Sequence, residues 1–169
     1  MSGQQSTLDP ALAAADPAAR CRDIDGAVLL AAVLSLLPAG RRGALFPAEL
    51  DLGAVNAGDL CVVSGPKAPL EAFAATLAGQ GVEVQVIPIS IAAHSRMLEP
   101  ILPDFGAYLR SIPLSAPQIP IISNRDGQVL PDADAMDPEY WVRHLRGTVE
   151  FAAGIETLAG GDPKIFLEV

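Results

Sequence analysis

The strongest constraint on the fold is a change in the spacing of apolar residues between positions 52 and 86. Two short apolar runs, residues 52–56 and 60–64, are separated by Ala57-Gly58-Asp59, which is typical of a β-hairpin. The next apolar residues recur at the spacing of an amphipathic helix, namely Leu70, Phe73, Ala74, Leu77 and Ala78. Valines then alternate with polar residues over 82–86, as in a half-solvated strand. This stretch predicts strand, strand, helix, strand.

The residues before this stretch complete the order of elements. Residues 27–33 are uniformly apolar, and periodicity alone leaves strand and helix both open there. Residues 34–46 contain Pro38, Gly40 and Gly43, so any helix in them is short. With a strand first, residues 26–90 follow the ferredoxin-like βαββαβ order. Residues 1–25 show no sustained apolar period and are interpreted as a poorly ordered linker or junction.

The part of the chain after His94 has helical spacing interrupted by prolines and turns. Pro100 and Pro103 confine regular helix to the residues that follow them. Asp137 is the expected cap of a later helix, because Pro138 suits a first helical position. We predict a helix after Pro103, followed by strands over 119–123 and 128–130 that are joined by a turn at Asp126-Gly127. Helices are then predicted from Asp137-Pro138 and over 149–158, and a final strand over 164–169.

Composition and charge narrow the classes of function. Half of the residues are hydrophobic and 18% are charged, which predicts a globular chain rather than a disordered one. The net charge of −9 argues against a nucleic-acid partner, which needs a clustered basic face. The longest apolar run, residues 27–37, is shorter than the roughly 20 residues that span a bilayer, so no membrane association is expected. Cys21 and Cys61 have no metal-ligand spacing, Cys61 is expected to be buried, and a reducing cytoplasm fits this usage.

The residue with the clearest chemical potential is His94, which follows the end of an apolar strand. Such a loop often carries a general base, although a histidine that bridges a turn is the commoner outcome for this pattern alone. Ser95 is interpreted as a helix cap, since adjacent residues rarely point at one another, and His144 is by pattern a helix-surface residue. The sequence contains no Gly-x-Ser-x-Gly elbow and no phosphate-binding glycine loop, and its clustered acids do not match a calcium loop. A self-sufficient serine hydrolase is therefore poorly supported.

Three segments together resemble the acyltransferase domain of modular polyketide synthases and the malonyl-CoA:acyl carrier protein transacylases. Residues 52–66 (LGAVNAGDLCVVSGP) are similar to the family's central hairpin, and residues 91–102 (IAAHSRMLEPIL) to the segment bearing its catalytic histidine. Residues 140–146 (YWVRHLR), with 149–151 and 166–169, are similar to its C-terminal signature. The resemblance implies an α/β fold in which a ferredoxin-like small subdomain, residues 26–90, precedes the C-terminal part of an α/β-hydrolase-like acyltransferase core, residues 91–169. It also implies a strand over residues 27–33.

The resemblance implies a reaction as well. In this family a serine on a Gly-His-Ser-x-Gly elbow takes a malonyl-type acyl group from coenzyme A and passes it to the phosphopantetheine thiol of an acyl carrier protein. His94 is then the general base for that serine, and the main-chain carbonyl of His144 fixes the tautomer of His94. Ile91, Ala93 and Asn56 are implied as substrate-binding residues. The implied partners are acyl-CoA, the carrier protein and the remainder of a polyketide synthase, with no permanently bound cofactor and no metal.

The sequence also departs from the family's pattern. Residues 1–25 hold neither the elbow serine, nor the arginine that pairs with the substrate carboxylate, nor the glutamine of the oxyanion hole, so we expect the isolated chain to be inactive. Residues 91–94 (IAAH) match neither the malonyl-selective nor the methylmalonyl-selective form, and malonyl is the default. Arg125, Arg143 and Arg146 are candidates for a basic patch that docks an acidic carrier protein. The alternatives are a non-catalytic ferredoxin-like binding or scaffolding domain and a fragment that folds poorly.

Overall fold

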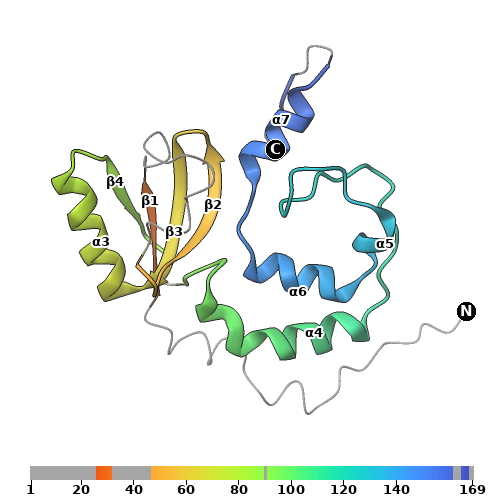
Figure 1. Cartoon of the computed structure of the whole chain (residues 1–169). Helices are drawn as coiled ribbons and strands as arrows, with labels where there is room; N and C mark the ends of the chain where they lie inside the picture. Colours follow the sequence, from red (N-terminus) through yellow and green to blue (C-terminus); the bar gives the residue numbers. More distant parts are fainter. Residues whose placement is uncertain (1–25, 32–46, 90, 162–164, 168–169) are drawn as a thin grey trace, which may run out of the picture.

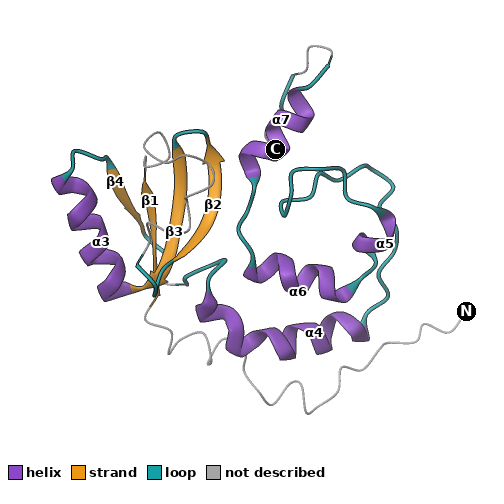
Figure 2. Ribbon diagram, in the orientation of Figure 1, coloured by secondary structure: helices purple, strands orange, loops and turns teal. Residues whose placement is uncertain are grey.

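The structure is a computed structural model that describes residues 26–31, 47–89, 91–161 and 165–167. Cys21, the expected linker over residues 1–25 and the short helix expected within 34–46 lie outside the described residues. The elements are shown in Figures 1 and 2. In chain order they are β1 (Gly26–Ala31), β2 (Asp51–Ala57), β3 (Leu60–Pro66), α3 (Lys67–Gly79), β4 (Val84–Ile87), the 3₁₀ helix η3 (Arg96–Ile101), α4 (Leu102–Ser111), α5 (Asp132–Ala135), α6 (Pro138–Arg146) and α7 (Phe151–Ala159).

The four strands form one antiparallel sheet in the order β2-β3-β1-β4. β1 is confirmed as a strand and lies between β3 and β4, with Leu29 opposite Val63 on one side and Val86 on the other. The predicted hairpin is confirmed too, because Ala57 pairs with Leu60 across Gly58-Asp59. This strand order is the one that the ferredoxin-like pattern requires.

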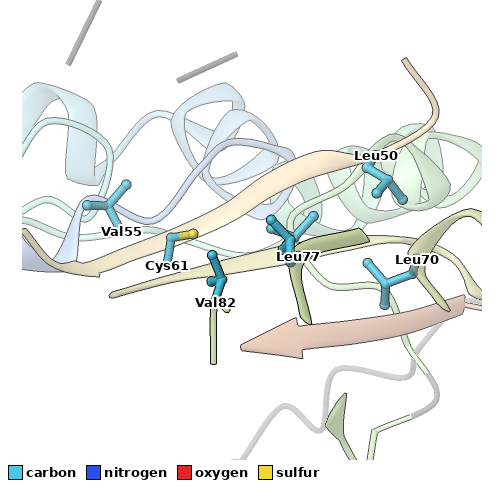
Figure 3. Close-up of a cluster of buried hydrophobic side chains, with 7 residues drawn as sticks. Leu50, Val55, Cys61, Leu70, Leu77 and Val82 are labelled. Carbon is cyan, nitrogen blue, oxygen red and sulfur yellow. The ribbon is translucent and has the colours of Figure 1, made fainter. Parts of the chain in front are cut away.

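The main core lies between the sheet and α3, which covers one face of the sheet in Figure 1. α3 contributes Leu70 and Leu77, and Gly81, with φ of 76°, then lets the chain turn so that Val82 joins the core. Cys61 is fully buried there, as predicted. Each fully buried aliphatic side chain contributes about 1.5–3 kcal/mol. Figure 3 labels most of this cluster, which comprises Leu50, Val55, Cys61, Val63, Leu70, Leu77 and Val82.

The predicted alternation over residues 82–86 is only partly found. β4 begins at Val84, after the buried Val82, and Val86 is 59% exposed on this edge strand. The valines of the alternation therefore do not share one buried face.

The residues after 91 form a helical layer beside the sheet (Figure 2). Pro103 lies in the first turn of α4, so regular helix begins where the prolines predicted. α4 and α6 pack closely, as two contacts show. A Cβ added at Gly106 of α4 would lie 3.2 Å from Val142 of α6, and Arg110 of α4 pairs with Glu139 of α6. Asp137 caps α6 as predicted, with its side chain accepting from the Glu139 N–H at 2.9 Å.

Two predicted strands in this part are shortened and one is not found. Residues 119–123 and 128–130 form only one antiparallel bridge, Ile122 to Val129, since Pro120 and Pro131 have no N–H to extend the ladder. The turn between them is as predicted, with Gly127 at φ of 71°. Residues 165–167, from the predicted final strand, are not in a strand, and no partner for them occurs among the described residues.

Candidate active site

His94 lies in a loop that contains two fully buried residues. Ala92 and Ser95 have no exposed surface. The Ser95 hydroxyl donates to the Ala92 carbonyl at 2.7 Å and accepts from the Met97 N–H at 3.2 Å, so Ser95 caps η3 as predicted. Its proton is already committed to a main-chain carbonyl, so Ser95 supports the loop and is not placed to act as a nucleophile.

The backbone of His94 adopts an unusual conformation. Its φ of 54° lies in the left-handed region, and it is the one non-glycine residue there in the described part of the chain. A non-glycine residue in this region costs of the order of 1 kcal/mol or more, so the surrounding loop must enforce it. Residues held in this way are concentrated at functional sites.

The His94 imidazole is fixed by one hydrogen bond. Its Nδ1–H donates to the main-chain carbonyl of Gly147 at 2.9 Å, across 53 residues of sequence. Because a carbonyl can only accept, Nδ1 carries a proton, and in the neutral ring Nε2 is then the nitrogen with the lone pair. Within the described residues Nε2 makes no hydrogen bond, and the side chain is half-buried. This is the state in which an imidazole takes up a proton at Nε2.

The carbonyl that holds His94 belongs to Gly147, which corrects the prediction that assigned this role to His144. His144 lies within the last turn of α6, where carbonyls point along the helix axis. Gly147 is the first residue past the helix, with φ of −79° and ψ of 163°, and this extended conformation turns its carbonyl away from the axis. The end of α6 therefore decides which carbonyl reaches His94.

Strand β2 holds both partners of this hydrogen bond. The segment after α6 lies parallel to β2, with the Val149 N–H donating to Gly53 at 2.9 Å and the Val55 N–H donating to Val149 at 2.8 Å. The Thr148 hydroxyl adds a bond to the Leu52 carbonyl at 2.8 Å. On the other side, the His94 loop lies against β2, since a Cβ at Gly53 would be at ordinary contact distance, 3.5 Å, from the Ala93 carbonyl; the contact that requires a glycine there is with Ser64 Oγ, at 2.7 Å.

A carboxylate at the start of β2 joins the same two segments. Asp51 accepts hydrogen bonds from the backbone N–H of Arg96 at 2.8 Å, from its Nε at 3.0 Å and from its Nη2 at 3.2 Å. It also accepts from Arg146 Nη2 at 3.3 Å, and Arg146 Nε in turn donates to Glu99 at 3.0 Å. Burial alone raises the pKa of the Asp51 carboxyl, but hydrogen bonds from Arg96 and the charges of Arg146 and Arg96 together hold this pKa below its ordinary value.

The ring of His144 lies beside that of His94, edge to face, with 6.0 Å between the ring centroids. It also contacts Tyr140 and Trp141, at 6.3 and 5.9 Å. Burial lowers the pKa of His144, and the neighbouring His94 and Arg125 lower it further. His144 is therefore neutral at neutral pH, and its ring forms an uncharged wall next to the candidate base.

The other residues implied by the resemblance are found in different settings. Ile91 is 42% exposed and Ala93 is half-buried in the His94 loop, where the Ala93 N–H donates to the Ile91 carbonyl at 2.9 Å. Asn56 is half-buried on β2, and among the hydrogen bonds and ring contacts of the described residues none joins it to that loop.

No three His, Cys, Asp or Glu side chains in the described part of the chain are placed to hold a metal. None of the helices seen there has both the length and the apolar character needed to cross a bilayer.

The three arginines predicted as a basic docking patch all have contacts within the chain. Arg143 pairs with Asp137 at 3.2 Å, and Arg146 is held by two carboxylates. Arg125 lies over the ring of Tyr140, with 5.7 Å from the guanidinium carbon to the ring centroid. Each of the three charges therefore has a partner within the chain, and that of Arg146 also joins α6 to β2.

Sequence reasoning missed Gly147, Asp51 and Arg96. A main-chain carbonyl leaves no mark in the residue type, so only the location of the helix end points to Gly147. Asp51 directly precedes the first segment of family resemblance, and Arg96 lies within the second. Their opposite charges were the sequence signal that could have suggested an ion pair between them.

Comparison with known proteins identifies the family. Residues 30–169 match the family described as "Acyl transferase domain". The chain is 35% identical over 136 residues to polyketide synthase GfsA of Streptomyces halstedii, covering 80% of this chain and 2% of that protein. It is 36% identical over 120 residues to the pikromycin polyketide synthase component PikAIII of Streptomyces venezuelae, covering 71% of this chain and 8% of that protein. The chain thus spans a small part of these relatives.

Solved structures give the same result. The acyl transferase domain of SpnD, in complex with 2-(pent-4-yn-1-yl)malonyl, superposes with a TM-score of 0.75 at 34% identity over 83% of this chain and 34% of that one. FabD from Acinetobacter baumannii has a TM-score of 0.68 over 83% of this chain and 47% of that one, and at 18% identity it shows the shared fold alone. The mixed α/β fold expected from the resemblance is confirmed. The chain belongs to the acyl transferase domain family found in polyketide synthases, and it covers about a third of such a domain.

Proposed function

We propose that this chain supplies the general base, and the scaffold that holds it, to an acyltransferase that moves malonyl-type acyl groups. The observation that carries the proposal is the 2.9 Å hydrogen bond from His94 Nδ1–H to the Gly147 carbonyl, which leaves the Nε2 lone pair available. Membership of the acyl transferase family supports this choice of reaction. The malonyl compound in the solved SpnD domain supports the choice of acyl class.

In the proposed reaction, His94 Nε2 takes the proton of a serine hydroxyl as the serine oxygen attacks the thioester carbonyl of an acyl-CoA. When the carbon–sulfur bond breaks, His94 returns this proton to the leaving thiolate, and the acyl group remains on the serine as an ester. The phosphopantetheine thiol of an acyl carrier protein then gives its proton to Nε2 and attacks the ester. The departing serine oxygen recovers that proton, so each half-reaction begins and ends with a neutral His94.

The Gly147 carbonyl has a second role in this proposal. When Nε2 is protonated the imidazole becomes a cation, and a hydrogen bond from a charged donor is about twice as strong as one from a neutral donor. The carbonyl therefore stabilises the imidazolium at the moment when the reaction needs it, besides keeping Nε2 directed at the serine.

The serine itself is proposed to come from acyltransferase sequence outside these 169 residues, because none of the serines here lies in a Gly-x-Ser-x-Gly elbow. The isolated chain is accordingly proposed to be inactive. Within the intact enzyme, residues 26–90 are proposed as the small subdomain and residues 91–169 as the last part of the core. Ile91, Ala93 and Asn56 remain proposed substrate-binding residues, and the remainder of a polyketide synthase, acyl-CoA and an acyl carrier protein remain the proposed partners.

A labelling experiment tests this division of roles. A chimaera would carry residues 47–161 of this chain in place of the matching part of the SpnD acyl transferase domain. We expect radiolabelled malonyl-CoA to label the chimaera on its elbow serine, to pass the label to a carrier protein, and to leave the isolated 169-residue chain unlabelled. Stoichiometric labelling of the isolated chain, or a folded chimaera that takes up no label, would overturn the proposal.

A further inference from the structure

The hydrogen bond between His94 and Gly147 depends on the relative placement of two separate segments. One is the loop that carries His94, and the other is the segment that leaves α6. Hydrogen-bond energy falls steeply when donor and acceptor move out of range or alignment, so a small shift of either segment would release the imidazole. Some feature must hold the two segments in register.

Asp51 contacts both segments close to His94 and Gly147. Arg96 is two residues after His94, and Arg146 directly precedes Gly147. Both arginines donate to the same carboxylate, which is 14% exposed, whereas their own side chains are 47% and 30% exposed. One carboxylate on the rigid strand β2 thus links the two sides of the His94–Gly147 contact.

The contact with Arg96 fixes the backbone as well as the side chain. Asp51 Oδ2 accepts from the Arg96 main-chain N–H at 2.8 Å, in addition to the guanidinium bonds. A long arginine side chain alone leaves the backbone free to move, whereas a bond to the main-chain N–H restrains the loop two residues from His94. The restraint thus acts close to the His94 backbone, which is held at φ of 54°.

We propose that Asp51 is a positioning residue, which keeps the His94 imidazole in its Nδ1–H tautomer by holding the Arg96 and Arg146 segments together. This inference rests on the proposed role of His94 as general base. Other contacts limit the damage when Asp51 is changed, because the segment after α6 also pairs with β2 and Arg146 retains Glu99. Loss of Asp51 should therefore loosen the imidazole without unfolding the chain.

The tautomer can be measured directly on the whole chain, without any catalytic activity. Long-range ¹H–¹⁵N correlation spectra distinguish Nδ1–H from Nε2–H, and the chain has only two histidines, so His144→Gln assigns His94. The ring ¹⁵N shifts also separate a neutral imidazole from an imidazolium, so the tautomer is compared at an alkaline pH at which these shifts show neutral rings. We expect wild-type His94 to show a single Nδ1–H tautomer and Asp51→Asn to shift both ring ¹⁵N resonances toward the averaged values of a mixture.

Matched variants separate positioning from a general loss of charge or fold. Glu139→Gln also removes one carboxylate from an arginine pair, but the pair with Arg110 is exposed and away from His94, so its spectrum should match wild type. Asp51→Glu keeps the carboxylate and should recover most of the single tautomer. Circular dichroism checks that each variant is folded, and if Asp51→Asn is not, Arg96→Ala takes its place with a smaller shift in the same direction.

The possible results are distinguishable. A folded Asp51→Asn, or failing that a folded Arg96→Ala, whose His94 keeps the wild-type resonances overturns the positioning role and leaves the proposed function intact. A shift of the same size in Glu139→Gln also overturns it. A wild-type His94 in the Nε2–H form contradicts the geometry on which the proposed function itself rests.

Discussion

Replacement of Ser95 by alanine tests how firmly the His94 loop is held. The Ser95 hydroxyl is fully buried, donates to the Ala92 carbonyl at 2.7 Å and caps η3 through the Met97 N–H at 3.2 Å. Loss of a helix cap costs about 1 kcal/mol. A buried carbonyl left without a donor costs about 1–3 kcal/mol. We therefore expect Ser95→Ala to lower the free energy of unfolding by about 2–4 kcal/mol, a large share of the 5–15 kcal/mol that typically stabilises a domain.

Equilibrium unfolding in urea, followed by circular dichroism, measures this difference. Ser111→Ala is the matched control, since the Ser111 hydroxyl also donates to a carbonyl, that of Tyr108 at 2.7 Å, but on the exposed surface. Water can replace that hydrogen bond in Ser111→Ala, so we expect this variant to lose less than about 0.5 kcal/mol of the free energy of unfolding. Equal losses in the two variants, at an unchanged slope with urea, would refute the reasoning that burial makes the Ser95 bonds costly to remove.

Three further changes have expected outcomes. Gly127→Ala should cost about 1–3 kcal/mol more than Gly81→Ala in the same urea assay. Both glycines have positive φ, but only a Cβ at 127 would meet a carbon of α7, at 2.5 Å, so equal losses would contradict the packing. Asp51→Asn should lower the free energy of unfolding at pH 7. The ionised carboxylate stabilises the fold fully above the ordinary aspartate pKa of about 3.9, so the difference from wild type should vanish as pH falls through the lowered pKa of Asp51. A difference that persists in strong acid would exclude the ion pairs as its source. Arg125→Ala should raise the pKa of His144 in an NMR titration, and an unchanged pKa would show that the Arg125 charge does not reach the ring.

Local signals in the sequence were enough for the elements that local physics determines. The hairpin β2–β3 and helix α3 were predictable because a turn and two distinct apolar periods mark them. The cap residues Ser95 and Asp137 were predictable because a short polar side chain before a helix has one common use. β1 needed the family resemblance, because a wholly apolar run fits a buried strand or a buried helix equally.

Contacts between distant segments were beyond this reasoning. The Gly147 carbonyl was missed because main-chain atoms are the same in every residue, and its direction follows from where α6 ends. The Asp51 cluster joins positions 45 and 95 residues apart, for which no period exists in the sequence. The strands over 119–123 and 128–130 were predicted too long because the apolar pattern outweighed Pro120 within the first and Pro131 after the second.

We propose His94 as the general base for a serine on an elbow that these 169 residues do not contain. The most direct test is the rate of acyl-serine formation from malonyl-CoA in the chimaera, measured by rapid quench with His94→Ala. Loss of the base should slow this step by about 10³-fold or more, whereas His144→Gln, which keeps the backbone, should cost less than the roughly 10²-fold minimum for a lost general base. A His94→Ala chimaera that acylates its serine at the unchanged rate would contradict the account.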